Sequence, residues 1–265
     1  MICANCDSVF ESKFCPNCGQ KADIHQISIK TVAHDLLHAF THTDKGFLLT
    51  TKELIKRPGI VAKEYINGKR KKYFNPLSFL VITMAVSAYF SFKSGYFESF
   101  ASNRPKTQTE QRDIKKPVEQ KQLDTFARVR MEAYRIIIHD GKMLGLVLIT
   151  PLITILSWIF FRKPKHGIAE HFVLQSYLFG LSNIFRVVLF IPLFIITGLN
   201  VKIIDYVFQI LFLFYLILGF HQFFRNRIFF TIVKSILILV LFIFLFWYSI
   251  WGYVYAKHFI IDLLN

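Results

Sequence analysis

The sequence predicts an all-α integral membrane protein, a bundle of five transmembrane helices preceded by a small cysteine-rich finger. Hydrophobic residues make up 54% of the 265 residues and the mean hydropathy is +0.42, a balance that ordinary soluble domains do not reach. The apolar residues gather in five stretches, each near the roughly 20 residues that a helix needs to span a bilayer. All four cysteines of the chain lie near its N-terminus.

The finger is predicted from two Cys-x-x-Cys pairs, Cys3 with Cys6 and Cys15 with Cys18, separated by eight residues. Each short turn directs two sulfur atoms at one point, and Gly19 relaxes the backbone where amides turn toward sulfur, so the pairs suit tetrahedral Zn²⁺. Disulfides are the alternative, but we expect no cleavable signal peptide and a cytosolic, reducing environment. We therefore predict a zinc-ribbon-like finger over residues 1–20, folded largely by its metal.

Each apolar stretch is flanked by charged residues. All five are predicted to be helices, because the backbone groups of an open sheet edge would find no hydrogen-bond partner in lipid. The predicted spans are residues 73–92, 143–161, 171–201, 206–224 and 235–256. The first is the weakest, since Asn75 and Pro76 shorten its apolar length. The third is the longest and is interrupted by a single charge, Arg186.

The distribution of lysine and arginine predicts a cytoplasmic N-terminus and an external C-terminus. Basic residues crowd before the first span, after the second and after the fourth, whereas the opposite connections carry few. The exception is the 93–142 connection, whose charges are mixed and lie mostly away from the membrane. The net charge of +15 fits cations that meet anionic headgroups beside the apolar runs. These features predict a multi-pass membrane protein with its N-terminus in the cytoplasm.

Residues 21–72 are predicted to form amphipathic, basic helices on the cytosolic side. Apolar residues recur at helical spacing over residues 27–56, with a turn at 44–46. The tripeptide at 57–59 breaks this pattern.

A short helix over residues 60–66 should follow and stop at Asn67-Gly68. The membrane domain then occupies residues 73–265. Its 93–142 connection begins as a polar, proline-punctuated tract, so we expect that connection to be mobile.

A basic run precedes the first span and is a candidate contact for lipid or for a partner. Its members are Arg57, Lys69, Arg70, Lys71 and Lys72. A basic segment near a zinc finger could also bind nucleic acid. Its position against a membrane span disfavours nucleic acid and favours anionic lipid, with a protein partner or a phosphate ligand as the next alternative.

Three histidines, His34, His38 and His42, recur every four residues and would stack along one helix face. This spacing makes them a weak candidate for a second metal site or a proton-responsive face. Solvated or interfacial histidines are the simpler interpretation, because no acidic or cysteine partner accompanies them at suitable spacing.

Arg186 is the most informative charge of the membrane half, since it lies near the middle of the third stretch. On a helix it shares a stripe with Gln175 and Ser182, and Asn183 lies beside it. A guanidinium at that depth is costly and faces a protein interior, a partner or a water-filled cavity. Its candidate partners are Glu170, Asp205 and Asp140. Alternatively, a bend near Pro192 lets Arg186 reach the interface by snorkelling.

Several motifs in the first third of the chain resemble a bacterial membrane-protein family, domain-of-unknown-function family 3667. They are Phe-Cys-Pro-Asn-Cys-Gly-Gln at 14–20, His38, Thr-Asp-Lys-Gly-Phe at 43–47, Arg-Pro-Gly at 57–59 and Tyr-Ile-Asn-Gly-Lys-Arg-Lys-Lys-Tyr-Phe-Asn-Pro at 65–76. The resemblance implies a finger joined to a helical domain in the bacterial inner (cytoplasmic) membrane, without an established reaction.

No catalytic motif is recognisable: the sequence has no phosphate-binding glycine loop, no nucleophile motif and no paired carboxylates within a span. We expect a non-enzymatic inner-membrane protein whose cytosolic finger recruits or senses a partner, in a chain that could also form homo-oligomers. The alternatives are a small transporter or channel with an anion or lipid-headgroup site around Arg186 and, less favoured, a lipid-acting enzyme that uses the histidine face.

Overall fold

The computed structural model describes residues 1–22, 46–96, 99, 149–162 and 166–264. Within these ranges the secondary structure is helical, apart from two isolated bridges in the finger, so the all-α class is confirmed for this part of the chain. Four helical stretches are long and apolar enough to cross a membrane. They are Pro76–Lys93, Ile168–Thr197, Val201–Phe224 and Ile228–Leu245.

The second predicted span, residues 143–161, is described only from residue 149. There, α8 (Thr150–Phe160) is apolar and ends one residue before the predicted boundary, whereas residues 143–148 lie outside the described part. Five transmembrane helices therefore remain a prediction. The 93–142 connection, apart from its first residues and Ser99, also lies outside the described residues.

Asn75 and Pro76 set the start of the first span, α4 (Pro76–Lys93), three residues later than predicted. The Asn75 side chain accepts hydrogen bonds from the amides of Leu77 and Ser78, at 3.0 and 3.2 Å. Pro76 occupies the first helical position, where its missing amide hydrogen costs nothing. The pair that shortens the apolar stretch thus caps the helix.

The long third stretch is one continuous helical segment made of α9 (Ile168–Phe185), η3 (Arg186–Phe190) and α10 (Ile191–Thr197). η3 is a single π-helical turn in which the Ile191 amide donates to the Arg186 carbonyl. Pro192 has no amide hydrogen to offer, so the wider turn before it accommodates the proline without ending the helix.

A tight turn joins this segment to α11 (Val201–Phe224). Gly198 ends α10 with a φ of 61°, and the Asn200 side chain accepts a hydrogen bond from the Lys202 amide at 3.0 Å to cap α11. α11 ends at Arg225, a C-cap with a φ of 53°, and α12 (Ile228–Leu264) follows.

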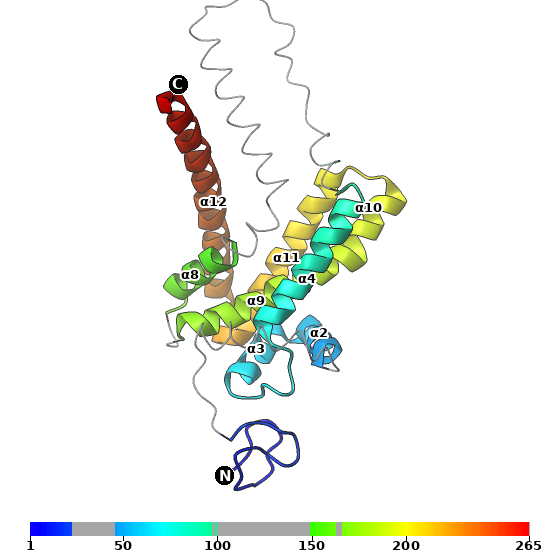
Figure 1. Cartoon of the computed structure of the whole chain (residues 1–265), viewed down its shortest axis with the longest axis vertical. Coiled ribbons are helices and arrows are strands. Elements are labelled where there is room, and N and C mark those ends of the chain that lie inside the picture. Colours follow the sequence, from blue (N-terminus) through cyan, green and yellow to red (C-terminus); the bar gives the residue numbers. More distant parts are fainter. Residues whose placement is uncertain (23–45, 97–98, 100–148, 163–165, 265) are drawn as a thin grey trace, which may run out of the picture.

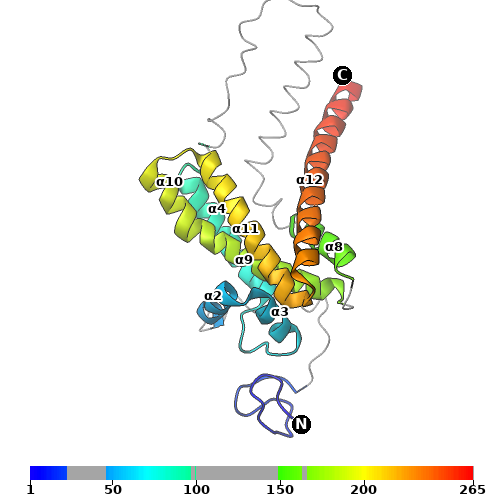
Figure 2. The same cartoon turned by 180° about the vertical axis from the view of Figure 1, so that it is seen from behind.

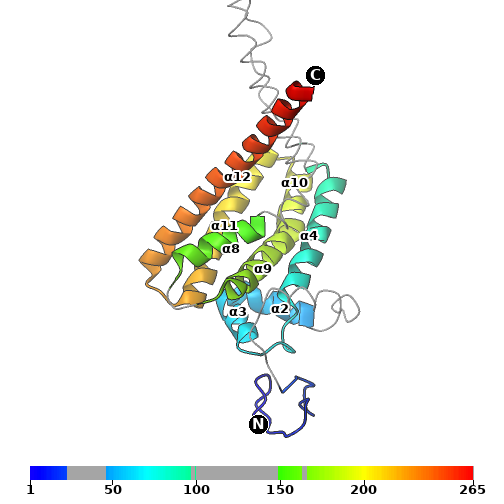
Figure 3. The ribbon, with the colours of Figure 1, turned by 60° about the vertical axis from the view of Figure 1, so that its left-hand side comes forward.

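Figures 1 and 2 show α4, α9 with α10, and α11 lying side by side, while α12 diverges from them. Figure 3 shows α8 crossing the bundle between α9 and α12, both of which it contacts. The finger lies at one end of the long axis and the C-terminus lies toward the other.

Two shorter helices, α2 (Gly46–Lys56) and α3 (Pro58–Ile66), cover the bundle at the end that faces the finger. α3 ends at the predicted residue, and its start is earlier than predicted because Pro58 fits the first helical turn. The predicted amphipathic helix is found over residues 46–56, whereas residues 27–45 lie outside the described part.

Hydroxyl groups bind α2 and the loop between α3 and α4 to the membrane helices. The Tyr177 hydroxyl donates to the Phe74 carbonyl at 2.6 Å, and the Tyr215 hydroxyl donates to the Leu54 carbonyl at 3.0 Å. The Phe74 amide in turn donates to the buried Thr50 hydroxyl. These bonds satisfy backbone groups that the apolar core would otherwise leave unpaired.

Candidate metal centre and the loop that holds it

The finger is built from two similar turns, one for each cysteine pair. The amide of Cys3 donates to the carbonyl of Ser8 at 2.9 Å, and the amide of Cys15 donates to the carbonyl of Gln20 at 2.8 Å. Each turn closes through a residue of positive φ, Asp7 in the first and Gly19 in the second. Gly19 thus occupies the left-handed position for which its backbone freedom is suited.

The two turns bring the four cysteine sulfur atoms within 4.8 Å of one another. All four thiols are free, and Cys3 and Cys15 are buried. Four convergent thiols could hold a metal ion, and such a set fills a tetrahedral coordination sphere without an open position. The finger extends to Ala22, whose amide donates to the Lys13 carbonyl, two residues beyond the predicted boundary.

Ser8 is a polar neighbour of the cluster that the sequence analysis did not identify. Its hydroxyl lies 2.9 Å from the sulfur of Cys6 and 3.1 Å from that of Cys15. Hydrogen bonding with Ser8 is the largest cause that lowers the pKa of Cys15, to about 6, and that of Cys6, although the single hydroxyl hydrogen can be donated to only one of the two sulfur atoms at a time. A lowered pKa favours the thiolate, which is the form that binds a metal.

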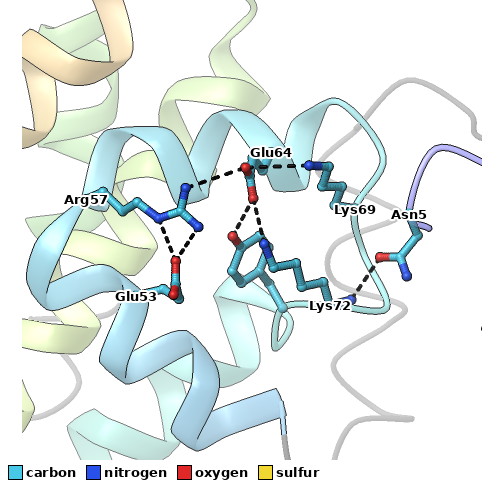
Figure 4. A network of polar contacts seen from close by, with 7 residues as sticks. Asn5, Glu53, Arg57, Glu64, Lys69 and Lys72 are labelled. Carbon is cyan, nitrogen blue, oxygen red and sulfur yellow. Dashed lines mark hydrogen bonds and ion pairs between the residues drawn. The ribbon is translucent and has the colours of Figure 1, made fainter. Parts of the chain in front are cut away.

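The first cysteine turn also contacts the loop between α3 and α4. The Asn5 side-chain oxygen accepts a hydrogen bond from the Lys72 amide at 3.1 Å, and Figure 4 shows this contact beside a network of charged residues. Because Asn5 lies between Cys3 and Cys6, the contact joins the cysteine cluster to the part of the chain just before the first span.

Glu64 of α3 is the centre of that network, as Figure 4 shows. Its carboxylate pairs with Lys72 at 3.2 Å, Lys69 at 3.5 Å and Arg57 at 3.7 Å, and it accepts a hydrogen bond from the Tyr73 hydroxyl. Burial alone would raise the pKa of Glu64, but Tyr73 and the lysines outweigh it and hold that pKa below its usual range.

The network changes the interpretation of the basic run that the sequence identified. Arg57 pairs with Glu53 as well as with Glu64, so it and the two lysines have acidic partners within the chain. Lys71 is exposed and remains a candidate lipid or partner contact, as does the half-buried Arg70. The sequence did not indicate the role of Glu64, because Lys69 and Lys72 do not follow it at the spacing of three or four residues that brings side chains together on one helix.

The intramembrane candidates are not brought together as one site. Arg186 pairs with Asp205 of α11 at 3.8 Å, and its guanidinium lies 4.4 Å from the centre of the Phe208 ring. Among the described residues no side-chain hydrogen bond or ion pair joins the Arg186 guanidinium to Gln175, Ser182 or Asn183, and only the Arg186 backbone amide donates to the carbonyls of Ser182 and Asn183. Ser182 donates instead to a carbonyl of its own helix, and Gln175 is fully buried.

Among the three predicted partners of Arg186, the structure selects Asp205. Glu170 lies 2.5 Å from His166, and Asp140 lies outside the described residues. The side-chain amide of Gln209 donates a hydrogen bond to the second carboxylate oxygen of Asp205 at 2.7 Å. Arg186 is thus neutralised by protein groups, which gives no support to an anion site there. His34, His38 and His42 lie outside the described residues.

In the part of the chain that the structure describes, these observations define a helical protein with four apolar helices long enough to cross a membrane and a four-cysteine cluster that could hold a metal ion. Residues 44–88 match the model of a family described as Protein of unknown function (DUF3667), which confirms the resemblance over this segment. The segment contains α2, α3, the Glu64 network and most of α4. No curated protein and no solved structure matches the chain.

Proposed function

We propose that this protein recruits a protein partner to the membrane surface through its finger, and that it is not an enzyme. In this proposal the finger holds one Zn²⁺ and faces the cytosol, and the helices anchor it in the bacterial inner membrane. The observation that carries the proposal is an exposed apolar pair on the finger, Ile2 with Val9.

The finger exposes large apolar side chains that its small core does not use. Ile2 is 73% exposed and Val9 is 77% exposed, and the two residues pair in an antiparallel bridge. Residues directly opposite in such a bridge have side chains on the same face, so Ile2 and Val9 form one apolar surface. Adjacent exposed apolar side chains on a small domain mark an interaction site.

Metal binding would control whether this surface exists. The bridge flanks the first cysteine turn, because Ile2 precedes Cys3 and Val9 follows Ser8, so ligation by all four thiolates would fix the two segments that form the bridge. A finger of this size has too little core to fold alone, and its folding free energy would come from the metal. Four sulfur ligands suit Zn²⁺ and leave no position for a substrate.

The contact of Asn5 with the α3–α4 loop attaches the finger to the membrane domain. The Glu64 network stiffens that loop, because three cations converge on one carboxylate. A partner bound at Ile2 and Val9 would therefore be held close to the cytosolic face of the bilayer. Exposed Lys71 would face the same membrane surface and its anionic lipids.

Site-specific photo-crosslinking in bacterial cells tests this function. A photoreactive residue at position 9 should give a discrete cross-linked protein, whereas the same residue at Asn17, which is exposed on the second turn, should not. The adduct should disappear in the Cys15→Ser, Cys18→Ser variant.

Metal analysis of the same preparations serves as the control. Wild-type protein should contain one zinc per chain, and the double cysteine variant should contain none. Identical adducts from positions 9 and 17, or an adduct that persists without zinc, would contradict recruitment through the metal-bound finger.

A further inference from the structure

The finger-facing end of the bundle contains a second group of cations, formed where α3 crosses the end of α11. The Gly59 amide donates to the side-chain oxygen of Gln222 at 3.1 Å. A Cβ atom on Gly59 would lie only 2.3 Å from the carbonyl oxygen of Gly219, so the two backbones touch. This close crossing fixes the position of Lys63, one helical turn after Gly59.

Lys63 consequently lies beside the last turn of α11. Its ammonium is 5.6 Å from the centre of the buried Phe223 ring. Arg225, two residues later, is exposed at the left-handed C-cap of the helix, and Arg227 follows it at the surface. Burial and the nearby Arg225 charge both lower the pKa of Lys63.

The nearby acids are already engaged elsewhere. Glu64, next to Lys63 in sequence, faces Lys69, Lys72 and Arg57. Glu170 pairs with His166, whose ring lies 4.8 Å from that of Phe223. Among the described residues no carboxylate forms an ion pair with Lys63 or Arg225, so two like charges, one beside the Phe223 ring and the other two residues after Phe223, lie at this end of α11 without a counter-charge.

We propose that Lys63 and Arg225 form a binding site for a phosphate group at the finger-facing membrane surface. The phosphate could belong to an anionic lipid headgroup or to a soluble phosphate compound. Arginine offers a planar fork to phosphate and lysine offers a mobile point charge, so the pair matches this ligand. The site differs from the Lys69–Lys72 run, where Glu64 already serves as the anion.

A purely structural role for the same cations makes a different prediction. Positive side chains at the C-terminal end of α11 also interact with its last carbonyl groups and with the helix dipole. That interaction would stabilise the protein equally with and without phosphate. A phosphate-dependent stabilisation is therefore the property that distinguishes the binding site from a helix cap.

The test measures the melting temperature of the full chain in three nanodisc samples. These are phosphatidylcholine alone, phosphatidylcholine with phosphatidylglycerol, and phosphatidylcholine with added inorganic phosphate at matched ionic strength. We expect the wild type to melt about 3 °C higher in at least one of the two samples that add an anionic phosphate than in phosphatidylcholine alone, whose headgroup phosphate is neutralised by its own choline cation. A shift only with phosphatidylglycerol assigns the lipid headgroup, and a shift only with inorganic phosphate assigns a soluble compound.

Matched variants identify the residues. The Lys63→Gln, Arg225→Gln variant should lose the shift, while Lys52→Gln, Lys56→Gln, with the same change in charge on exposed residues of α2, should keep it. Arg225→Gln alone, at an exposed position, should reduce the shift even if the double variant folds poorly. The proposal is overturned by a wild type that shows no shift, by an Arg225→Gln variant that keeps it, or by equal losses in the two double variants.

Discussion

At the scale of single residues, the surroundings of the cysteine cluster depend on the Ser8 hydroxyl, which lies 2.9 Å from the sulfur of Cys6 and 3.1 Å from that of Cys15. The spacing of the cysteines is a local sequence property, so it identified all four members before the fold was known. Ser8 also lies within the finger, but a serine between two cysteine pairs carries no signal by itself. Only the fold of the two turns places its hydroxyl between the sulfur atoms of Cys6 and Cys15.

We predict that Ser8→Ala weakens zinc binding by about tenfold, the lower end of the range for residues that hydrogen-bond to metal ligands. The alanine cannot donate to the Cys15 sulfur, so the pKa of that thiol should rise and more free energy should be needed to deprotonate it. Competition with a chromophoric chelator measures the change. Ser12→Ala, whose hydroxyl donates to the Phe14 carbonyl, is the matched control, and equal losses in both variants would refute the role of Ser8.

Arg186 could be selected from the sequence because a charge within a long apolar stretch is conspicuous. The partner of Arg186 could not be selected from the sequence, because all three candidates lie near predicted membrane ends, namely Asp205, Glu170 and Asp140. The turn at Gly198 explains why Asp205 is the partner, since it folds the start of α11 back along η3 and brings Asp205 to the guanidinium.

We predict that Arg186→Leu destabilises the protein by roughly 1 to 3 kcal/mol, because it leaves Asp205 without its cation in a half-buried position. Thermal unfolding in detergent measures the loss. Adding Asp205→Asn should restore part of it, since the neutral amide carries no unpaired charge. An Arg186→Leu variant that melts at or above the wild-type temperature would show that the ion pair contributes no stability.

At the scale of helices, the sequence predicted the elements where local signals begin and end them. Asn67 is such a signal and follows the end of α3 as predicted, whereas α3 begins two residues before its predicted start, at Pro58, and α4 three residues after its predicted start, at Pro76. Contacts between helices carry no local signal. The glycine of the Arg-Pro-Gly tripeptide was interpreted as a helix breaker, yet Gly59 lies inside α3, where it permits backbone contact with α11.

Gly59→Ala should therefore cost at least about 2 kcal/mol, as expected for overpacking where the neighbour is backbone and cannot rotate away. The new methyl group would meet both the Gly219 carbonyl and the Phe223 amide. Gly167→Ala is the control, because a Cβ there has no atom within 4 Å. Thermal melting should separate the two variants by several degrees, and equal melting temperatures would mean that α3 can move away from α11.

At the scale of the whole molecule, the path of the chain constrains the number of membrane crossings. α4 runs away from the finger, yet α9 starts again at the finger end and also runs away from it (Figures 1 and 3). The chain between these helices must therefore return once, or another odd number of times. α11 then returns to the finger end, and α12 leaves it.

An odd number of spans, with the two termini on opposite sides, follows if the four long apolar helices all cross the bilayer. Hydropathy alone could not establish this, because a stretch as long as Ile168–Thr197 could equally be divided into a re-entrant pair. The continuous path through η3 removes that option, since Pro192 is accommodated by a wider turn rather than by a break.

We therefore predict that reporter fusions after Ser94, after Lys165 and at Asn265 read outside, inside and outside, with the N-terminus inside. The first and last positions follow α4 and α12, which both run away from the finger, and the middle position precedes α9, which starts beside it. Fusions of a reporter active only in the periplasm and of one active only in the cytosol, made at the same three sites, should give complementary signals. An inside signal at Asn265 together with an outside signal after Ser94 would mean that α12 does not cross, and its apolar side chains would then need a cover other than lipid.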